Sequence, residues 1–279
     1  MGKFYDAIMG LVVGDALGVP YEFKERDTFK AVDMVGYGTH NQPVGTWSDD
    51  SSMTLATVES LARLGKIDLA DIMNNFEKWL YRGEFTAHGD VFDVGRTTVI
   101  AVERYHYGLA SVHNCGGKNM MDNGNGALMR ILPLAFTKAE LPAVSDVASL
   151  THAHGISCAI CLQYVNAARE LLGGINKRSI SDGFGIEHLT REQVKSTGYV
   201  VDTFNAALWC LMNTESYREC VLTAVNLGGD TDTIAAVAGG LTGIYYGVGG
   251  DKGIPIEWIL KIHRRIWIEQ LCEKFEARF

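Results

Sequence analysis

Apolar residues recur every three or four positions along most of this 279-residue chain, which is the spacing of helices that bury one face. The segments that show it most clearly are 4–12, 53–64, 69–80, 156–172 and 256–271. Gly65, Gly83 and Gly173 follow three of them, where glycine commonly ends a helix, and Pro255 stands where proline commonly begins one. Strand-like alternation is nearly absent, with Thr28–Val35 as a weak candidate. The pattern predicts an all-α protein.

The sequence contains no segment that resembles a linker between domains. The polar stretch Asn176–Lys195 is interpreted as a surface insertion that joins two apolar halves. We therefore expect a single compact multi-helix domain over residues 1–279, and any site that combines residues from both halves would lie inside it.

Composition narrows the range of partners. Hydrophobic residues make up 47% and charged residues 21% of the chain, which is ordinary for a globular protein with a substantial core. The formal net charge is −8 and no basic run is present, so nucleic acid is not expected as a partner. No stretch of about eighteen apolar residues and no signal-like N-terminus is found, so we expect no membrane span and a cytoplasmic location.

Cys158 and Cys161 form a C-x-x-C pair, a spacing that occurs in redox and zinc sites. The chain holds no second such pair, and both residues fall within an apolar helical run. They are therefore interpreted as small buried helix residues.

Two acidic clusters that also carry hydroxyl groups are the strongest chemical signal. Ser48–Asp50 and Asp230–Thr233 lie about 180 residues apart, and each precedes an apolar run with helical spacing. Each cluster could be a plain helix N-cap, but a cap needs only one such residue. If the fold brings the clusters together, their carboxylates require divalent metal. An all-oxygen ligand set favours Mg²⁺ or Mn²⁺, with Ca²⁺ a further candidate, over zinc.

Four further sites are weaker candidates when each is taken alone. Glu22 follows a helix stopped by Pro20 and could be an ordinary solvated loop carboxylate, whereas Asp93 could be a helix N-cap. The turn Asn123–Gly126 could open a helix whose free N–H groups cradle a diphosphate, although ordinary turn chemistry explains it as well. His152 is as readily a hydrogen-bonded interior histidine as a ligand contact.

Taken in chain order, these segments resemble the ADP-ribosylglycohydrolase family, and the agreement runs almost from end to end. The matching motifs are Gly14-Asp15-Ala16-Leu17-Gly18 with Glu22, Trp47-Ser48-Asp49-Asp50, Phe92-Asp93-Val94-Gly95, Asn123-Gly124-Asn125-Gly126-Ala127-Leu128-Met129-Arg130, Leu150-Thr151-His152, Gly198-Tyr199-Val200-Val201-Asp202-Thr203, Asn226-Leu227-Gly228-Gly229-Asp230-Thr231-Asp232-Thr233, and Ile254-Pro255 before Trp258. Because several separate motifs keep their order, the resemblance is specific. Ser48 departs from the threonine that the family usually has there, but it retains the hydroxyl.

The resemblance implies an all-helical globule with two Mg²⁺ or Mn²⁺ ions in a central cleft. The metal ligands that it implies are Ser48, Asp49, Asp50, Asp230, Asp232 and Thr233. Glu22 would lie near the metals, and Asp93 would lie near the scissile bond, where it could hold a substrate guanidinium. Together with Asp49 these two form the expected catalytic set. The implied substrate-binding residues are Asp93, Asn123, Gly124, Asn125, Gly126 and His152.

The function that the resemblance implies is removal of ADP-ribose from modified proteins by metal-assisted cleavage of the ribose N-glycosidic bond to arginine. ADP-ribosylated protein and ADP-ribose are the expected partners. Serine-linked or small ADP-ribose conjugates are alternative substrates, and a catalytically silent relative, crystallin-like or ADP-ribose-binding, is an alternative role. An isoprenoid synthase also binds Mg²⁺-diphosphate through helical aspartates. It is disfavoured because Met53 occupies the place of a further acidic residue.

Overall fold

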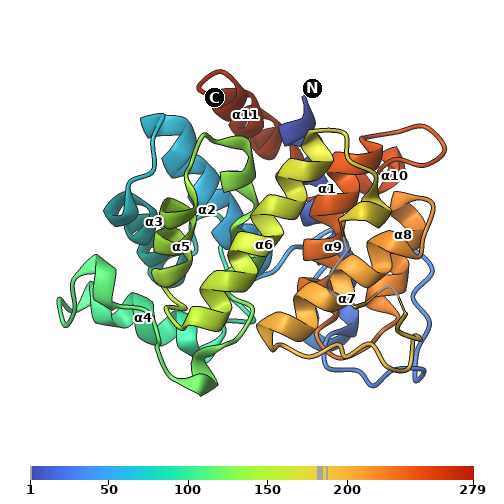
Figure 1. Cartoon of the computed structure of the whole chain (residues 1–279), viewed down its shortest axis with the longest axis horizontal. Coiled ribbons are helices and arrows are strands. Elements are labelled where there is room, and N and C mark those ends of the chain that lie inside the picture. Colours follow the sequence, from blue (N-terminus) through green and yellow to red (C-terminus); the bar gives the residue numbers. More distant parts are fainter. Residues whose placement is uncertain (1, 181–184, 187) are drawn as a thin grey trace.

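The computed structural model describes residues 2–180, 185–186 and 188–279, and helices dominate it (Figure 1). The α-helices are α1 (Lys3–Gly18), α2 (Asp49–Leu64), α3 (Leu69–Arg82), α4 (Arg96–His106), α5 (Leu141–Ser149), α6 (Gly155–Leu172), α7 (Val200–Met212), α8 (Tyr217–Val225), α9 (Thr231–Tyr246), α10 (Ile256–Ile259) and α11 (Arg265–Glu276). The short 3-10 helices are η1 (Val19–Tyr21), η2 (Gly38–His40), η3 (Val112–Asn114), η4 (Met120–Asp122), η5 (Leu128–Arg130), η6 (Leu132–Phe136) and η7 (Lys177–Ser179). Within the described ranges, β-structure is limited to isolated bridges. The prediction of an all-α fold is confirmed.

Several helix ends follow the local signals in the sequence. Gly65 directly follows α2 and Gly83 directly follows α3, and both glycines have the left-handed backbone that residues with a side chain rarely adopt. At the start of α2, the side chain of Ser48 accepts a hydrogen bond from the N–H of Asp50. Ser48 therefore caps this helix, whatever else its hydroxyl does.

The long last helix predicted from Pro255 onward is wrong, because the segment forms α10 and α11 with a break between them. Arg264 lies at the break with φ +51°, and its guanidinium sits over the ring of Trp267. The N–H of His263 donates to the carbonyl of Gly45 instead of to a carbonyl of its own helix. Contacts with a distant loop thus outweigh the helical periodicity.

The weak strand candidate at Thr28–Val35 is not a strand. The side chain of Asn226 donates to the carbonyl of Ala31 and accepts from its N–H. An amide side chain therefore makes the hydrogen bonds that a neighbouring strand would have made at this position.

The predicted surface insertion Asn176–Lys195 is described only in part, since residues 181–184 and 187 lie outside the described residues. Its residue Lys177 is buried, and the ammonium group donates to the carbonyl of Thr214 and to the hydroxyl of Tyr246. The expectation of a purely surface segment is therefore wrong at Lys177.

The helices α1 and α9 form the centre of the core, and α7 and α8 also pack on α9 (Figure 1). Gly10 and Gly239 face one another so closely that a Cβ on either would clash with the carbonyl of the other. Gly14 and Gly18 meet the backbone of α9 in the same way, Gly18 at Asp232. Small residues allow such backbone contact. The end of α1 thereby lies against the start of α9.

The two ends of the chain lie close together on one side of the molecule (Figure 1). The rings of Phe4 and Phe275 are stacked, with centroids 3.7 Å apart. One hydrophobic core extends from α1 to α11, as expected for a single domain. No described helix is long and apolar enough to cross a membrane.

Replacing Gly14 with alanine should destabilise the protein, because the added methyl group has to push the backbones of α1 and α9 apart. Overpacking of this kind lowers the free energy of unfolding by about 1–3 kcal/mol. Thermal and urea unfolding followed by circular dichroism measure the change. Gly155→Ala is the matched control, since a Cβ at Gly155 in α6 meets no atom within 4 Å. A Gly14→Ala variant as stable as the wild type would contradict the close contact.

Candidate active site

The two acidic clusters meet at the N-terminal ends of α2 and α9. Carboxylate oxygens of Asp15, Asp50 and Asp232 lie within 4.8 Å of one another, and all three side chains are fully buried. The hydroxyl of Thr233 donates to Asp50 Oδ2 at 3.4 Å, which links the clusters directly. Helix N-termini carry partial positive charge, and this offsets the repulsion among the three anions only in part.

Asp15 belongs to this group, although its motif alone indicated no role for it. It accepts hydrogen bonds from the N–H of Ser48 and from the N–H and hydroxyl of Ser51. Burial raises the pKa of Asp15 to about 6, and these donors oppose the rise. Asp15 therefore holds the turn that presents Asp49 and Asp50. An aspartate in the otherwise apolar second half of α1, between Gly14 and Ala16, was the signal that could have identified it.

Three buried carboxylate oxygens of the clusters have no hydrogen-bond donor among the described residues. They are Asp50 Oδ1, Asp230 Oδ1 and Asp232 Oδ2. Burial, and then the neighbouring carboxylates, raise the pKa values of Asp50 and Asp232 well above the usual range. Unpaired buried anions are unfavourable, so these atoms fit a bound cation, and their oxygen chemistry fits a hard divalent ion. The acidic clusters can therefore hold metal.

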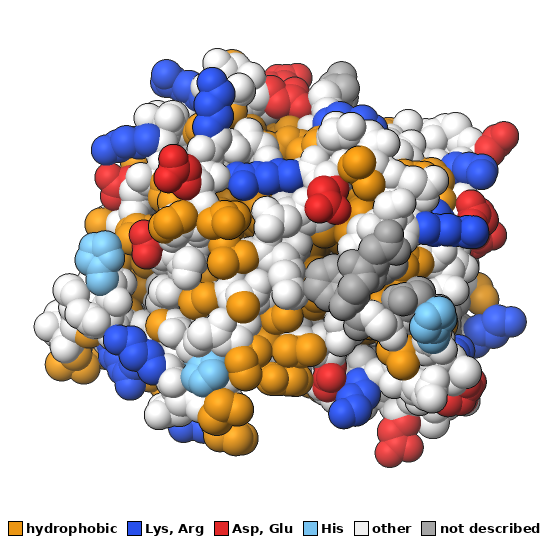
Figure 2. Space-filling model, viewed as in Figure 1, with side chains coloured by type: hydrophobic (Ala, Val, Ile, Leu, Met, Phe, Trp, Pro, Cys, Tyr) orange, Lys and Arg blue, Asp and Glu red, His pale blue; other side chains and the backbone are white. Residues whose placement is uncertain are grey.

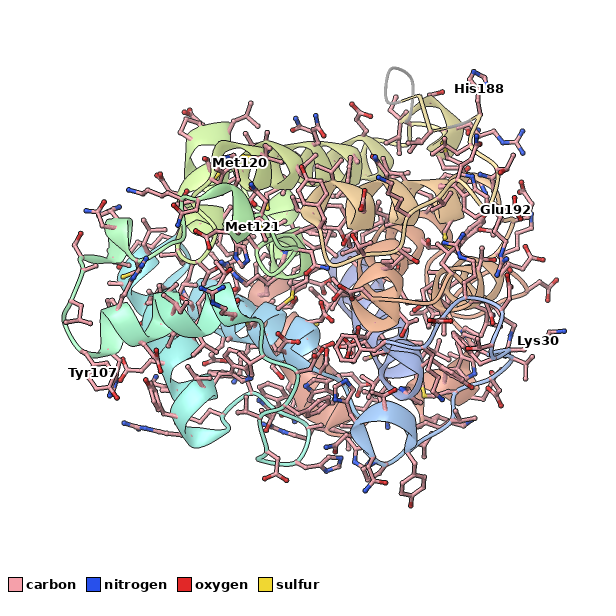
Figure 3. All side chains as sticks on the ribbon, turned by 90° about the horizontal axis from the view of Figure 1, so that it is seen from below. Lys30, Tyr107, Met120, Met121, His188 and Glu192 are labelled. Carbon is pink, nitrogen blue, oxygen red and sulfur yellow. The ribbon has the colours of Figure 1, made fainter. Side chains whose placement is uncertain are left out.

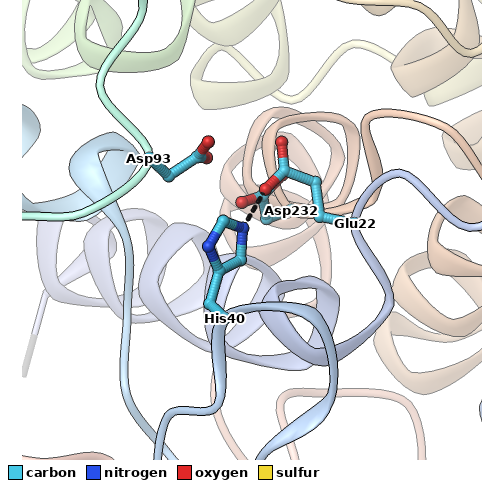
Figure 4. Close-up of side chains that lie close together, drawn as sticks. All are labelled: Glu22, His40, Asp93 and Asp232. Carbon is cyan, nitrogen blue, oxygen red and sulfur yellow. Dashed lines mark hydrogen bonds and ion pairs between the residues drawn. The ribbon is translucent and has the colours of Figure 1, made fainter.

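A second group lies beside the first and consists of Glu22, His40, Asp93 and Asp232, with one ligand atom of each within 4.8 Å of the others (Figure 4). Glu22 is buried, which excludes the solvated loop carboxylate considered above. His40 Nε2 donates to Glu22 Oε2. Burial raises the pKa of Glu22 to about 8; the bond from His40 opposes this rise, and the charges of Asp93 and Asp230 add to it. His40 ends the short 3-10 helix η2 and belongs to none of the motifs recognised in the sequence.

Asp93 and Asp49 face the same cavity. Asp93 is not a helix cap, because Gly95 occupies that position at the start of α4. Asp93 has φ +54°, a left-handed backbone that aspartate tolerates better than most residues. Burial, followed by the charges of Asp93 and Asp50, raises the pKa of Asp49 well above its usual range.

The cavity has a volume of about 390 Å³ and opens above these carboxylates. Asp49 and Asp230 of the two clusters line it together with Glu22, and the turn Gly124–Gly126 lines another part. Met121, which is labelled in Figure 3, also lines the cavity and is 89% exposed. A cavity of this size matches the ordinary range of small-molecule sites.

The turn Gly124–Gly126 lines the cavity, but it leads into the 3-10 helix η5 instead of the α-helix that the sequence suggested. Asn125 Nδ2 donates to Asp230 Oδ2 at 2.8 Å and so connects the turn to the second cluster. A Cβ at Gly126 would lie 2.8 Å from Cε1 of His152, so this position requires glycine. The turn therefore allows a ligand to come close to the backbone, and it does not present the N-terminus of an α-helix.

Asn123 is not among the residues that line the cavity. Its side-chain oxygen accepts from the N–H and the hydroxyl of Ser157 at the start of α6, and its amide nitrogen donates to the carbonyl of Met120. The geometry therefore gives Asn123 a part in holding the turn, and its predicted contact with the substrate stays a prediction.

His152 is buried in the cavity wall. Burial, and then the charge of Arg130, lower the pKa of His152 to about 3, so the ring is neutral. Its Nδ1 lies 2.8 Å from the hydroxyl of Thr151, which accepts from Arg130 Nη2 at 2.8 Å. A Thr151 hydroxyl that donates to Nδ1 leaves the N–H of His152 at Nε2, where it can serve as an uncharged donor.

The whole chain, residues 1–279, matches the model of the ADP-ribosylglycohydrolase family. The chain belongs to this family. The ADP-ribosylarginine hydrolase Tri1 of Pseudomonas putida (strain GB-1) is 33% identical over 291 residues, covering 98% of this chain and 77% of that protein. The ADP-ribosyl-[dinitrogen reductase] glycohydrolase of Rhodospirillum rubrum is 34% identical over 278 residues, covering 93% and 90%. A solved structure described as an ADP-ribosylglycohydrolase-related protein complex shares 30% identity and a TM-score of 0.84, covering 99% of this chain and 98% of that one.

Membership of the ADP-ribosylglycohydrolase family confirms the resemblance that the ordered motifs indicated. The relatives bear the names of hydrolases, so the prediction of a glycosidic-bond hydrolase is confirmed at the level of the family. The roles of individual residues as metal ligands, acids or substrate contacts stay predictions.

In the absence of divalent cations, the free energy of unfolding should fall as the pH rises. The pKa values of Asp15 and Glu22 are about 6 and about 8 in the folded chain, above the value of about 4 expected for an unfolded one. The folded state thus binds more protons than the unfolded chain in this range. These two groups therefore stabilise the folded state at low pH, and their contribution to the free energy of unfolding is lost as the pH rises toward 8.

Melting curves in EDTA and in Mg²⁺, recorded at about pH 5.5 and about pH 8, measure this effect. We expect the Tm difference between Mg²⁺ and EDTA to be larger at the higher pH, because the cation binds the ionised carboxylates. A Tm that Mg²⁺ leaves unchanged at both pH values would argue against a metal site here.

Proposed function

We propose that this protein is a divalent-cation-dependent hydrolase that releases ADP-ribose from modified proteins, and that it cleaves the N-glycosidic bond to arginine. The observation that carries the proposal is the set of unpartnered buried oxygens of Asp50, Asp230 and Asp232 beneath a cavity of small-molecule size. Family membership supports the reaction class, and the name of the Pseudomonas relative supports the arginine linkage.

Two Mg²⁺ or Mn²⁺ ions are proposed as the cofactors. The proposed ligands are Ser48, Asp49, Asp50, Asp230, Asp232 and Thr233, which offer oxygen atoms alone. A pair of ions is favoured because both acidic clusters contribute buried oxygens without a donor among the described residues, Asp50 Oδ1 from one cluster and Asp230 Oδ1 and Asp232 Oδ2 from the other. When bound, such ions supply positive charge that orients sugar hydroxyls and promotes ionisation of a water molecule.

The ADP-ribose portion is proposed to occupy the cavity beside Gly124–Gly126 and His152. The close backbone of the turn and the uncharged N–H of His152 suit the phosphate and hydroxyl groups of such a ligand. Asp93 is proposed to hold the guanidinium of the modified arginine, since a carboxylate and a guanidinium form a charge-assisted and often bidentate contact. Its place in the cavity beside Asp49 suits that role.

The reaction breaks the bond between the anomeric carbon of ribose and a guanidine nitrogen, and positive charge develops on the sugar ring. The hydroxyl of a water molecule becomes attached to the carbon, and the departing nitrogen gains a proton. Glu22 is proposed to move this proton between the water and the leaving group, with Asp93 as the neighbouring acid. Asp49, which faces the same space, completes the proposed catalytic set.

A protein substrate and a cytoplasmic location are part of the same proposal. Lysine and arginine side chains are scattered among acidic ones on the face in Figure 2, which does not resemble a nucleic-acid-binding stripe. All six cysteines are free and buried, as suits a reducing compartment.

The purified protein should release ADP-ribose from arginine-linked substrate with Mg²⁺ or Mn²⁺ and should not do so in excess EDTA. The assay offers arginine-linked and serine-linked ADP-ribosylated proteins in parallel and quantifies the free ADP-ribose. Release from the serine linkage alone would overturn the arginine assignment, and release from neither would favour a catalytically silent role.

The same assay with Asp232→Ala should show neither turnover nor tight metal binding, because Asp232 belongs to both acidic groups. Its helical circular dichroism should stay close to that of the wild type. Asp146→Ala, which removes an exposed aspartate from α5, is the matched control and should behave like the wild type.

Asp93→Asn should lower kcat/KM for the arginine-linked substrate by about 10–100-fold, since a hydrogen bond between charged groups is worth about 1.5–3 kcal/mol. The change keeps the size of the side chain and removes its charge. Affinity for free ADP-ribose, which lacks the guanidinium, should stay nearly unchanged in isothermal titration. An equal loss of affinity for ADP-ribose would show that Asp93 does not act through the guanidinium.

A further inference from the structure

The loop Tyr37–Asn41 holds the backbone of Glu22. The hydroxyl of Thr39 donates to the carbonyl of Glu22 at 2.7 Å, and Gly38 lies so close to Pro20 that a Cβ there would clash with the Pro20 carbonyl. Tyr37 and Asn41 have φ of +65° and +52°, a backbone that is unfavourable for residues with side chains. Such a conformation persists only where the surrounding contacts maintain it.

His40, in the same loop, connects the two segments that carry Glu22 and Asp93. Its Nε2 donates to Glu22 Oε2. Its ring lies 6.1 Å from that of Phe23 and 5.1 Å from that of Phe92, measured between centroids. These two phenylalanines directly follow Glu22 and precede Asp93 in the chain. Figure 4 shows one oxygen of Glu22 facing the imidazole while the other points away from it.

We propose that His40 is a positioning residue for the hydrolysis: its imidazole fixes the carboxylate of Glu22 so that the second oxygen faces the cavity beside Asp93. This inference rests on the proposed function and adds a residue to it.

The charges around Glu22 explain why its carboxylate needs such a partner. Asp93 and Asp230 lie near enough to repel it, and His40 is the one hydrogen-bond donor to this carboxylate in the described part of the chain. A glutamate side chain has three rotatable bonds, so without the imidazole the repulsion would turn it away from the cavity. Loss of a partner that orients a reacting or metal-binding group commonly lowers activity about 10–100-fold.

His40 acts through Glu22 and not on the substrate. It is not among the residues that line the cavity, and its Nε2 is already engaged by Glu22. A side chain that can donate from a similar distance should therefore replace it in part. Glutamine satisfies this condition, whereas alanine does not.

The test compares His40→Ala, His40→Gln and a control on the arginine-linked substrate with saturating Mg²⁺. His106→Ala is the matched control, because His106 pairs with Glu77 at 2.9 Å at an exposed place on α4 and α3. We expect His40→Ala to lower kcat about 10–100-fold with KM changed less than about threefold. His40→Gln should regain most of kcat, and His106→Ala should match the wild type.

An unchanged kcat in His40→Ala would overturn the inference, and so would equal losses in the alanine and glutamine variants. If His40→Ala does not fold, His40→Asn replaces it, since asparagine is one carbon too short to reach Glu22. Crystal structures of the variants supply a readout that does not depend on the substrate. Glu22 should be turned away from Asp93 in the alanine variant and in place in the glutamine variant. Inactivity of the wild type would refute the proposed function alone.

Discussion

Repulsion among buried carboxylates determines how the site and its surroundings are built. Asp15, Asp50 and Asp232 come from three helices and meet in the interior. The hydrogen bonds that they receive come from serine and threonine hydroxyls and from backbone N–H groups. Asp50 and Asp232 also lie in the first turn of a helix. These neutral donors and partial charges reduce the repulsion but do not remove it, because the pKa values of these groups remain raised. The chain thus supplies a buried anionic site that can hold a cation.

The contact between α1 and α9 makes this meeting of charges possible. Glycines at the interface bring the two backbones together, and the same approach sets the end of α1 against Asp232. The helix pair that dominates the core therefore also fixes the distance between Asp15 and the second cluster. Stability and site geometry depend on one set of small residues, and a change that separates the helices would affect both.

The sequence allowed much of the fold and part of the site to be predicted. Apolar periodicity and following glycines located α2 and α3, and the clusters were visible because several acidic and hydroxyl residues stand where a cap needs one. Features that depend on distant contacts could not be predicted. The break before α11 follows from a hydrogen bond to Gly45, and His40 lies in a loop whose left-handed residues leave no periodic signal. Asn123 belongs to a motif of the family, but its side-chain oxygen accepts a hydrogen bond from Ser157 and so holds the turn against α6.

Diffraction from crystals grown with Mn²⁺, with anomalous data collected near the manganese absorption edge, would locate a cation bound to these carboxylates. We expect anomalous peaks in contact with Asp50 and Asp232, at the buried oxygens that lack a donor among the described residues. Strong peaks only at other places on the molecule, or an empty cluster with its carboxylates unmoved at saturating Mn²⁺, would contradict this expectation.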